Sequence, residues 1–293
     1  MSSHTQVISA DALDNLRLMT ERDPRSLESQ MQRTLVPPLT YRGNAIEIHG
    51  QSIPKDEIGG DLVDLVTDDD STSAYVADVS GHGLRAGVLM GMIKTAMRYG
   101  LMLRQPLSRL LKDLNRLLPG LKDTHMFATL AALRFDGSDE VEYISAGHVP
   151  LLHWRRQSRE IVHHDATQLP LGLFADVPFT SVRIAFQPGD LLVLVSDGVV
   201  EAGEELDTRV GLNRLSELVS GQAQDTLDQL SSAIRTEICR LGEQHDDQTI
   251  LLVRALGMSS VFVPRHASGS AFPELFEAGW RKLLEGLAAE VES

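Results

Sequence analysis

Helical spacing of apolar residues marks several stretches of the chain. In each of them apolar side chains recur every three or four positions, which predicts helices with one buried face. Ser26 precedes one such stretch and is expected to be its N-cap. Another, 273–291, is amphipathic, and we expect it to pack on the domain or to serve oligomerisation or docking. The predicted helices cover 9–36 with a break at Asp23-Pro24, 84–99, 107–118, 212–220, 226–241 and 273–291.

The stretch 84–99 is apolar over an unusually wide arc. One stripe contains Leu84, Val88, Met92 and Ala96, and an adjacent stripe contains Leu89, Ile93 and Met97. An arc of this width predicts burial on more than one side of the helix. Met90, Met92 and Met97 are accordingly expected in the core.

Shorter apolar runs separated by turn residues predict strands. Asp68-Asp69-Asp70 and Asp136-Gly137 are expected at hairpin tips, and Gln187–Asp190 is expected to join a third hairpin. Residues 206–211 are expected to form a loop. The predicted strands are 46–49, 62–66, 73–79, 127–135, 140–145, 150–154, 182–186, 191–196 and 250–253.

Composition narrows the class of protein. The formal net charge of -14 argues against binding nucleic acid or an anionic membrane, which select Lys/Arg-rich surfaces. Cys239 is the single cysteine, so no intrachain disulfide can form. The sequence has neither an apolar run of membrane-spanning length nor a signal peptide. We therefore expect a soluble cytoplasmic protein.

Acidic residues border four of the apolar runs. They are Asp61, Asp78, Asp197 and Asp246, with Asp247 adjacent to the last. If the ends of these runs meet, the carboxylates repel one another unless cations neutralise them. Lys and Arg are scarce beside these motifs, and oxygen-only ligands select Mg²⁺ or Mn²⁺. The pattern predicts a site for divalent cations, although a lone Asp at a strand end is most often a turn or capping residue.

Other candidate chemistry is weaker. The chain has no Gly-x-Ser-x-Gly elbow and no Gly-x-x-x-x-Gly-Lys phosphate loop. His163-His164-Asp165 resembles a metal-ligand run, but it is expected in a polar loop without a partner motif. His82 could contact substrate or satisfy its turn, and Arg85 could reach a phosphate or pair with an acid. Cys239 is expected in the core, and the roles of His148 and His245 stay open.

Seven motifs together resemble one known family. In order they are Glu57-Ile-Gly-Gly-Asp61, Ala77-Asp-Val-Ser-Gly-His-Gly83, Ser145-Ala-Gly-His148, Leu169-Pro-Leu-Gly-Leu173, Pro188-Gly-Asp190, Ser196-Asp-Gly-Val-Val-Glu-Ala202 and Asp246-Asp-Gln-Thr249. Over roughly residues 40–255 the chain resembles the bacterial, SpoIIE/RsbU-like branch of the metal-dependent protein phosphatases (PPM, or type-2C). The resemblance implies an α+β fold, an α-β-β-α sandwich of two antiparallel sheets flanked by helix pairs.

The resemblance also implies roles for individual residues. Two Mn²⁺ or Mg²⁺ ions would be held by Asp78, which bridges them, by the Val79 carbonyl, and by Asp61, Asp197 and Asp246. Asp78, Asp197 and Asp246 would be the catalytic acids. Asp247, His82, Arg85 and Gly60 would lie next to these ligands or the substrate, and Gly147-His148 would shape a nearby turn.

The implied reaction is hydrolysis of phosphoserine or phosphothreonine by direct attack of a metal-bridging water. The implied substrate is a phosphorylated anti-sigma-factor antagonist, a STAS-domain protein. Two alternatives stay open: a non-catalytic signalling module of the same fold, and a hydrolase of small phosphorylated metabolites.

The expected organisation has three parts: an N-terminal helical regulatory segment (1–40), the phosphatase domain (41–256), and a linker with a C-terminal amphipathic helix (257–293). Large sensory domains often precede this catalytic domain, and none is expected here. We therefore expect regulation through the terminal helices or a separate partner. A homodimer is a further option. Helix 26–36 is predicted to dock near the Gly59-Gly60 turn and to control metal binding.

Overall fold

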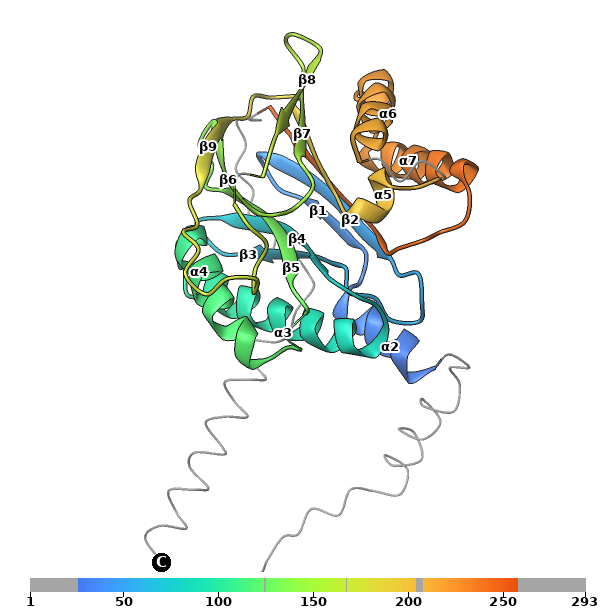
Figure 1. Cartoon of the computed structure of the whole chain (residues 1–293). Coiled ribbons are helices and arrows are strands. Elements are labelled where there is room, and N and C mark those ends of the chain that lie inside the picture. Colours follow the sequence, from blue (N-terminus) through green and yellow to red (C-terminus); the bar gives the residue numbers. More distant parts are fainter. Residues whose placement is uncertain (1–25, 124, 167, 204–207, 258–293) are drawn as a thin grey trace, which may run out of the picture. The chain divides into compact units, whose positions relative to one another are not determined.

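The computed structural model describes residues 26–123, 125–166, 168–203 and 208–257. These residues form two antiparallel sheets, one of six strands in the order β1-β2-β11-β10-β7-β8 and one of five in the order β3-β4-β5-β6-β9. The predicted α+β fold with two antiparallel sheets is confirmed (Figure 1). The six-stranded sheet consists of β1 (Leu39–Arg42), β2 (Ile46–Ile53), β7 (Leu151–Arg155), β8 (Glu160–His164), β10 (Leu191–Val195) and β11 (Gln248–Ala255). The five-stranded sheet consists of β3 (Leu62–Thr67), β4 (Thr72–Val79), β5 (Ala128–Phe135), β6 (Glu140–Ala146) and β9 (Val182–Ala185).

Helices cover the outer face of each sheet. α3 and α4 pack on the five-stranded sheet, and α6 and α7 pack on the six-stranded sheet (Figure 1). The short α2 packs on α3, and the Ser26 hydroxyl caps it by accepting a hydrogen bond from the Ser29 N–H at 3.1 Å, as predicted. The helices are α2 (Leu27–Leu35), α3 (Gly83–Met102), α4 (Leu107–Leu117), the 3₁₀ turn η1 (Leu118–Gly120), α5 (Asp197–Val200), α6 (Thr208–Gln222) and α7 (Leu227–Leu241).

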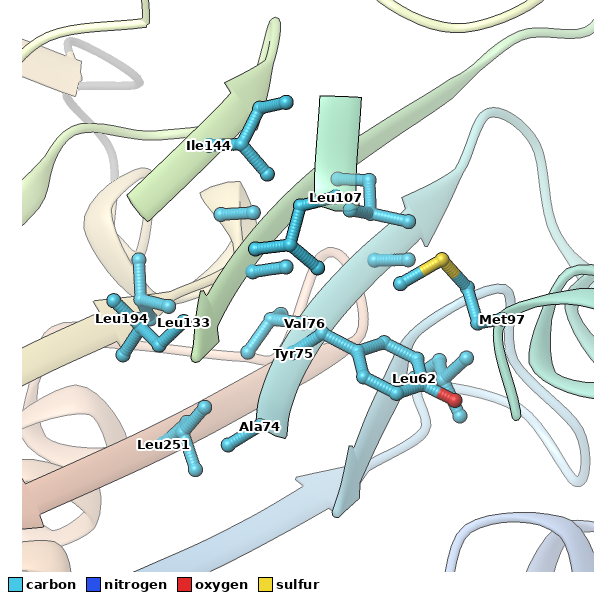
Figure 2. Packing of buried hydrophobic residues seen from close by; sticks show 14 of the residues in the cluster. Leu62, Ala74, Tyr75, Val76, Met97, Leu107, Leu133, Ile144, Leu194 and Leu251 are labelled. Atoms are coloured by element: carbon cyan, nitrogen blue, oxygen red, sulfur yellow. The ribbon is translucent and has the colours of Figure 1, made fainter. Parts of the chain in front are cut away.

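The main core lies between the two sheets. Leu62 and Val76 of one sheet and Leu194 and Leu251 of the other belong to the same buried cluster (Figure 2). A second cluster fills the space between the six-stranded sheet and α5–α7. In β10, Leu192 and Leu194 belong to the first cluster, whereas the residues that alternate with them belong to the second. This strand is buried on both faces, which explains its uninterrupted apolar run.

A buried ion cluster fixes α3 to the five-stranded sheet. The fully buried carboxylate of Asp64 accepts two hydrogen bonds from Arg98, at 2.6 and 2.7 Å, and one from the Tyr75 hydroxyl at 2.7 Å. Lys94 lies 3.4 Å from the same carboxylate. Charged hydrogen bonds of this kind are stronger than neutral ones. They hold α3, and the turn that precedes it, in a defined position over β3 and β4.

Two of the predicted connections are wrong. Strand β9 pairs with β6, whereas β10 pairs with β11 and β7, so 186–190 crosses between the sheets and does not close a hairpin. A Pro-Gly turn is compatible with either connection, and the partner strand decides between them. His163 and His164 lie in β8 and not in a polar loop, where the ring of His164 stacks on that of His153.

Some predicted boundaries and burials are also wrong. α6 begins at Thr208, inside the predicted loop, and β1 was not predicted. On α3, Leu84, Val88 and Met92 are 52%, 42% and 41% exposed, so this stripe faces solvent and only the Leu89, Ile93 and Met97 stripe is buried. Cys239 is exposed on α7, because the buried face of that helix is formed by other residues.

Within the part of the chain described, no helix combines the length and hydropathy needed to cross a bilayer. The predicted helical segments 9–25 and 273–291 lie outside the described residues.

Candidate active site

The predicted acids lie at the ends of strands from both sheets. Leu62 pairs with Ala77 across β3 and β4, which places Asp61 and Asp78 beside each other. In the other sheet, Val195 pairs with Ile250 across β10 and β11. Asp197 then follows β10 as the first residue of α5, and Asp246-Asp247 directly precede β11. Strand pairing therefore brings acids that are distant in sequence to one end of the sandwich.

Burial and the charges of neighbouring acids raise the pKa values of three of these carboxyls. Burial raises the pKa of Asp78 to about 8, helped by the charges of Asp197, Asp246 and Asp247. Burial, with the charges of Asp246 and Glu201, raises the pKa of Asp197 to about 6. Burial and the nearby charges of Asp78 and Asp247 hold the pKa of Asp61 well above its ordinary value.

Asp247 holds the loop that carries Asp61. Its Oδ2 accepts hydrogen bonds from the backbone N–H groups of Gly60, at 2.7 Å, and Asp61, at 3.3 Å. Its Oδ1 accepts one from the N–H of Lys55 at 2.7 Å. Burial raises the pKa of Asp247, and these backbone donors oppose that rise. Both oxygens of the Asp247 carboxylate thus accept hydrogen bonds from the backbone. This agrees with the prediction that Asp247 lies next to the metal ligands and is not one of them.

Gly60 brings its backbone against Val79. A Cβ at position 60 would lie 2.5 Å from the Val79 carbonyl oxygen, a distance that side chains do not tolerate. Val79 is buried, and its carbonyl is the backbone oxygen that the family resemblance implies as a ligand. The absence of a side chain at position 60 is therefore a condition for the close packing of the Asp61 loop on the end of β4.

Two of the predicted acids, Asp78 and Asp197, line a hollow whose other residues the sequence predicted only in part. The hollow has about 580 Å³ of space, open to solvent, and is lined by Asp78, Thr129, Gly147, His148, Val149, Pro150, Asp197, Glu201 and Thr208. Thr129 pairs with Asp78 across β4 and β5, and its hydroxyl lies 2.7 Å from Nδ1 of His148. Burial lowers the pKa of His148 to about 4, so its imidazole is neutral at physiological pH. Thr129 and Thr208 were missed because no local motif singles them out, and Glu201 was given no role although it lies within the Ser196–Ala202 motif.

The two basic candidates, His82 and Arg85, are exposed at the start of α3. The imidazole of His82 is exposed ahead of α3, 3.4 Å from Asp56. Arg85 is exposed on the first turn of α3, and its Nη1 donates to Asp123 at 3.2 Å. Of the two alternatives for Arg85, the structure thus has it paired with an acid.

The residues present suit hard divalent cations by their chemistry. All the donors are carboxylate or carbonyl oxygens, and Oδ2 of Asp61 is buried without a hydrogen-bond partner among the described residues. Across the same residues, however, no set of three or more His, Cys, Asp or Glu side chains is arranged at ligand spacing. The carboxylates would have to draw together around an ion, and their ligand roles stay predictions.

Comparison with known proteins identifies the family. The family model described as Stage II sporulation protein E (SpoIIE) matches residues 68–256, more than half of the chain. The chain belongs to the SpoIIE family. The resemblance drawn from the seven motifs is thereby confirmed. This SpoIIE-family chain is 29% identical over 233 residues to phosphoserine phosphatase RsbU of Bacillus subtilis, covering 78% of the chain and 69% of RsbU.

Further relatives agree with this assignment. Phosphoserine phosphatase RsbP of Bacillus subtilis is 23% identical over 248 residues, which cover 81% of the SpoIIE-family chain and 59% of RsbP. The solved RsbU and RsbW domains of Rv1364c from Mycobacterium tuberculosis match with a TM-score of 0.68 and 23% identity, over 86% of this chain and 70% of that one. The SiaA-PP2C domain of Pseudomonas aeruginosa matches with a TM-score of 0.65 and 17% identity, over 84% and 99%. At these identities the structural likeness establishes the fold.

Proposed function

We propose that this chain is a Mn²⁺- or Mg²⁺-dependent protein phosphatase that hydrolyses phosphoserine or phosphothreonine. The observation that carries the proposal is the convergence of Asp61, Asp78, Asp197 and Asp246-Asp247 at one end of the sandwich, where burial and neighbouring charges raise the pKa values of Asp61, Asp78, Asp197 and Asp247. Buried carboxylates that repel one another store an unfavourable energy, which cation binding relieves.

The relatives support this reading. RsbU and RsbP are both named phosphoserine phosphatases. RsbX, solved in complex with magnesium, matches 74% of this chain with a TM-score of 0.57. The oxygen-only donor set of the candidate site agrees with a cation of that type.

The chain's own groups have separable tasks in this reaction. Asp61, Asp78, Asp197, Asp246 and the Val79 carbonyl would hold two cations. When bound, those cations would neutralise phosphoryl charge and make water more acidic. His148 is hydrogen-bonded to Thr129 and forms part of the wall of the hollow. Because its imidazole is neutral, it adds no charge there. Asp247 keeps the Asp61 loop in place.

The likeness to RsbU supports a finer proposal for the substrate. We propose a serine-phosphorylated STAS-domain protein, an anti-sigma-factor antagonist, in the cytoplasm. Control would come from a separate regulatory partner or from a homodimer. In Rv1364c an RsbU domain occurs together with a second module, an RsbW domain, and this pairing agrees with such a regulatory setting.

The test uses the purified full chain with Mn²⁺. The wild type is expected to release phosphate from p-nitrophenyl phosphate and from the phosphorylated STAS-domain protein. Asp78→Asn and Asp197→Asn should each lower kcat at least ~100-fold, the loss of several kcal/mol of metal-assisted charge stabilisation, while circular dichroism stays unchanged. Asp113→Asn, an exposed acid on α4, is the matched control and should retain full activity. Undiminished turnover in either site variant would refute the proposal.

One observation favours a second candidate, a non-catalytic signalling module. It is the lack of ligand spacing among the acidic side chains of the described residues. Calorimetric titration with Mn²⁺ separates the two candidates. A catalytic site should bind the ion with release of protons, since carboxyls with raised pKa values must ionise to bind metal. A module without metal chemistry should give no heat of binding.

A further inference from the structure

Exposed apolar side chains gather beside the candidate active site. Leu117 and Leu121 come from the end of α4 and the turn after it, and Leu169, Leu173 and Phe174 come from the loop that follows β8. All five are between 45% and 61% exposed. We call these five residues the Phe174 patch. The two segments lie side by side, because a Cβ at Gly172 would meet Leu118 and Lys122, and grouped exposed apolar residues mark interaction sites more often than isolated ones do.

A buried asparagine keeps the loop of the patch in place. Nδ2 of Asn115 donates to the carbonyl oxygens of Phe174, at 2.7 Å, and Ala175, at 3.1 Å. Its Oδ1 accepts a hydrogen bond from the Gly172 N–H at 2.7 Å. Asn115 is buried in α4, so these bonds form away from water, where an unmade bond is costly. The fold therefore holds Leu173 and Phe174 at the surface by specific polar contacts.

The same loop packs against residues that line the hollow or adjoin its lining. Leu171 and Ala128 exchange two backbone hydrogen bonds, at 2.8 and 3.0 Å, and Ala128 directly precedes Thr129, which lines the hollow. Pro170 packs so closely against Gly147 that its ring leaves no room for a Cβ there. Gly147 lines the hollow as well. Through Pro170 and Leu171, the loop that carries Leu173 and Phe174 is therefore held next to the candidate active site.

Charge around the patch differs from the rest of the chain. Segment 107–123 has four basic and two acidic side chains, and the loop 165–181 adds two acidic ones, so the charges of the two segments balance within a chain of net charge -14. Arg116 is exposed beside Leu117, and Lys122 lies next to Leu121 and close to Gly172. A balanced, apolar surface repels an acidic phosphoprotein less than the rest of this acidic chain does, and it suits a partner with an apolar face.

We propose that the Phe174 patch docks the folded body of the phosphoprotein substrate while its phosphoserine enters the hollow; this inference rests on the proposed function. A second copy of the chain is the less suitable occupant, because seating it beside the hollow would obstruct the site. The patch would contribute affinity for the protein and nothing to the chemistry. Small phosphate esters, which cannot reach it, would not depend on it.

The test replaces Leu173 and Phe174 together by serine in the full chain. The substrates are p-nitrophenyl phosphate and the serine-phosphorylated STAS-domain protein, both with Mn²⁺. We expect kcat/KM for the phosphoprotein to fall at least ~10-fold through KM, as for the loss of apolar anchor residues, with kcat/KM for p-nitrophenyl phosphate changed less than ~2-fold. The matched control is Tyr99→Ser with Met102→Ser, two exposed apolar residues near the far end of α3, which should affect neither substrate.

A binding measurement separates this inference from the proposed function. In an Asp197→Asn background, the double serine variant should raise the Kd for the phosphoprotein at least ~10-fold, whether or not the wild type turns over. Equal losses on both substrates, or none on the phosphoprotein, would overturn the inference. So would a wild type that hydrolyses p-nitrophenyl phosphate and ignores the phosphoprotein, or a double variant whose main effect is a change of oligomeric state in light scattering.

Discussion

The carboxylate of Asp247 accepts a hydrogen bond from the backbone N–H of Gly60 at 2.7 Å, although the two residues lie 187 positions apart. The contact joins the loop before β11 to the loop before β3, one from each sheet. It therefore couples the two halves of the sandwich at the place where the acids meet.

Removing the hydrogen bonds of Asp247 should lower the free energy of unfolding, more for Asp247→Ala than for Asp247→Asn. Asp247→Ala leaves the N–H groups of Lys55, Gly60 and Asp61 without their acceptor, and an unsatisfied buried donor costs about 1–3 kcal/mol. Asp247→Asn keeps one acceptor oxygen and removes a repelling charge, so its loss should be about half as large. Urea unfolding without added metal measures both values. Asp113→Ala, at an exposed pair, should stay within about 0.5 kcal/mol, and equal losses for the two Asp247 variants would contradict this account.

Gly60→Ala should destabilise the protein, whereas Gly91→Ala should not. The new Cβ at position 60 meets the Val79 carbonyl at 2.5 Å, an overpacking that costs about 1–3 kcal/mol and moves a predicted ligand. At position 91, inside α3, a Cβ meets Leu35 at 3.7 Å, an ordinary contact, and alanine favours the helix by about 1 kcal/mol. Thermal unfolding should give opposite signs for the two variants. A shared sign would show that the contact with Val79 is not the cause.

Much of this architecture was predictable because its signals are local. The helices at 83–102, 107–117 and 227–241 have apolar spacing of three and four, and the hairpins at 68–70 and 136–137 have their turn residues. The acids could be singled out because each borders an apolar run, and such runs form strands whose ends lie together at one end of a sheet.

What sequence could not predict depends on partners far along the chain. The Gln187–Asp190 turn is the same whether the chain reverses or crosses to the other sheet, and only the pairing of β9 with β6 decides. Likewise, the contact between His148 and Thr129 arises from strand pairing. Thr129 belongs to no motif, so the sequence does not predict this contact. The exposure of Leu84, Val88 and Met92 was unpredictable because periodicity identifies an apolar stripe without showing what covers it.

Asp78→Asn should stabilise the metal-free protein and abolish its stabilisation by Mn²⁺. The pKa of Asp78 is about 8 in the folded protein, against an ordinary value of 3.8, so the folded state holds a proton that the unfolded chain has lost. The contribution of this carboxyl to stability is therefore favourable only at low pH, and it declines as pH rises from about 4 to about 8. The asparagine lacks this decline, so its advantage over the wild type should be larger at pH ~8 than at pH ~6.

Thermal unfolding in EDTA and in Mn²⁺ measures this difference at both pH values. Mn²⁺ should raise the Tm of the wild type, since a ligand that binds only the folded state stabilises it, and should leave the variant unchanged. Asp123→Asn, at an exposed acid that contacts Arg85, should behave as the wild type does. A variant that is less stable than the wild type in EDTA at the higher pH would contradict the repulsion argued for this site.

Helix α2, which precedes the first strand, contacts the loop that carries Asp61. Helix α2 was predicted to dock near Gly59-Gly60, and that position is confirmed, because Oε1 of buried Gln32 accepts a hydrogen bond from the Gly59 N–H at 3.2 Å. Its control of metal binding stays a prediction. Gln32→Met keeps the volume but removes the acceptor, which should loosen the loop that carries Asp61. We expect the Mn²⁺ concentration for half-maximal phosphatase activity to rise about 3–10-fold, equivalent to about 1 kcal/mol.

Saturating Mn²⁺ should restore most of the rate of Gln32→Met, because the ligands themselves are intact. Arg33→Gln, an exposed change on the same helix, is the matched control and should leave the Mn²⁺ requirement unaltered. A variant with the wild-type Mn²⁺ requirement would show that α2 contributes packing alone. A rate deficit that no concentration of Mn²⁺ corrects would show instead that the helix acts on the chemical step, so the titration distinguishes loop positioning from either alternative.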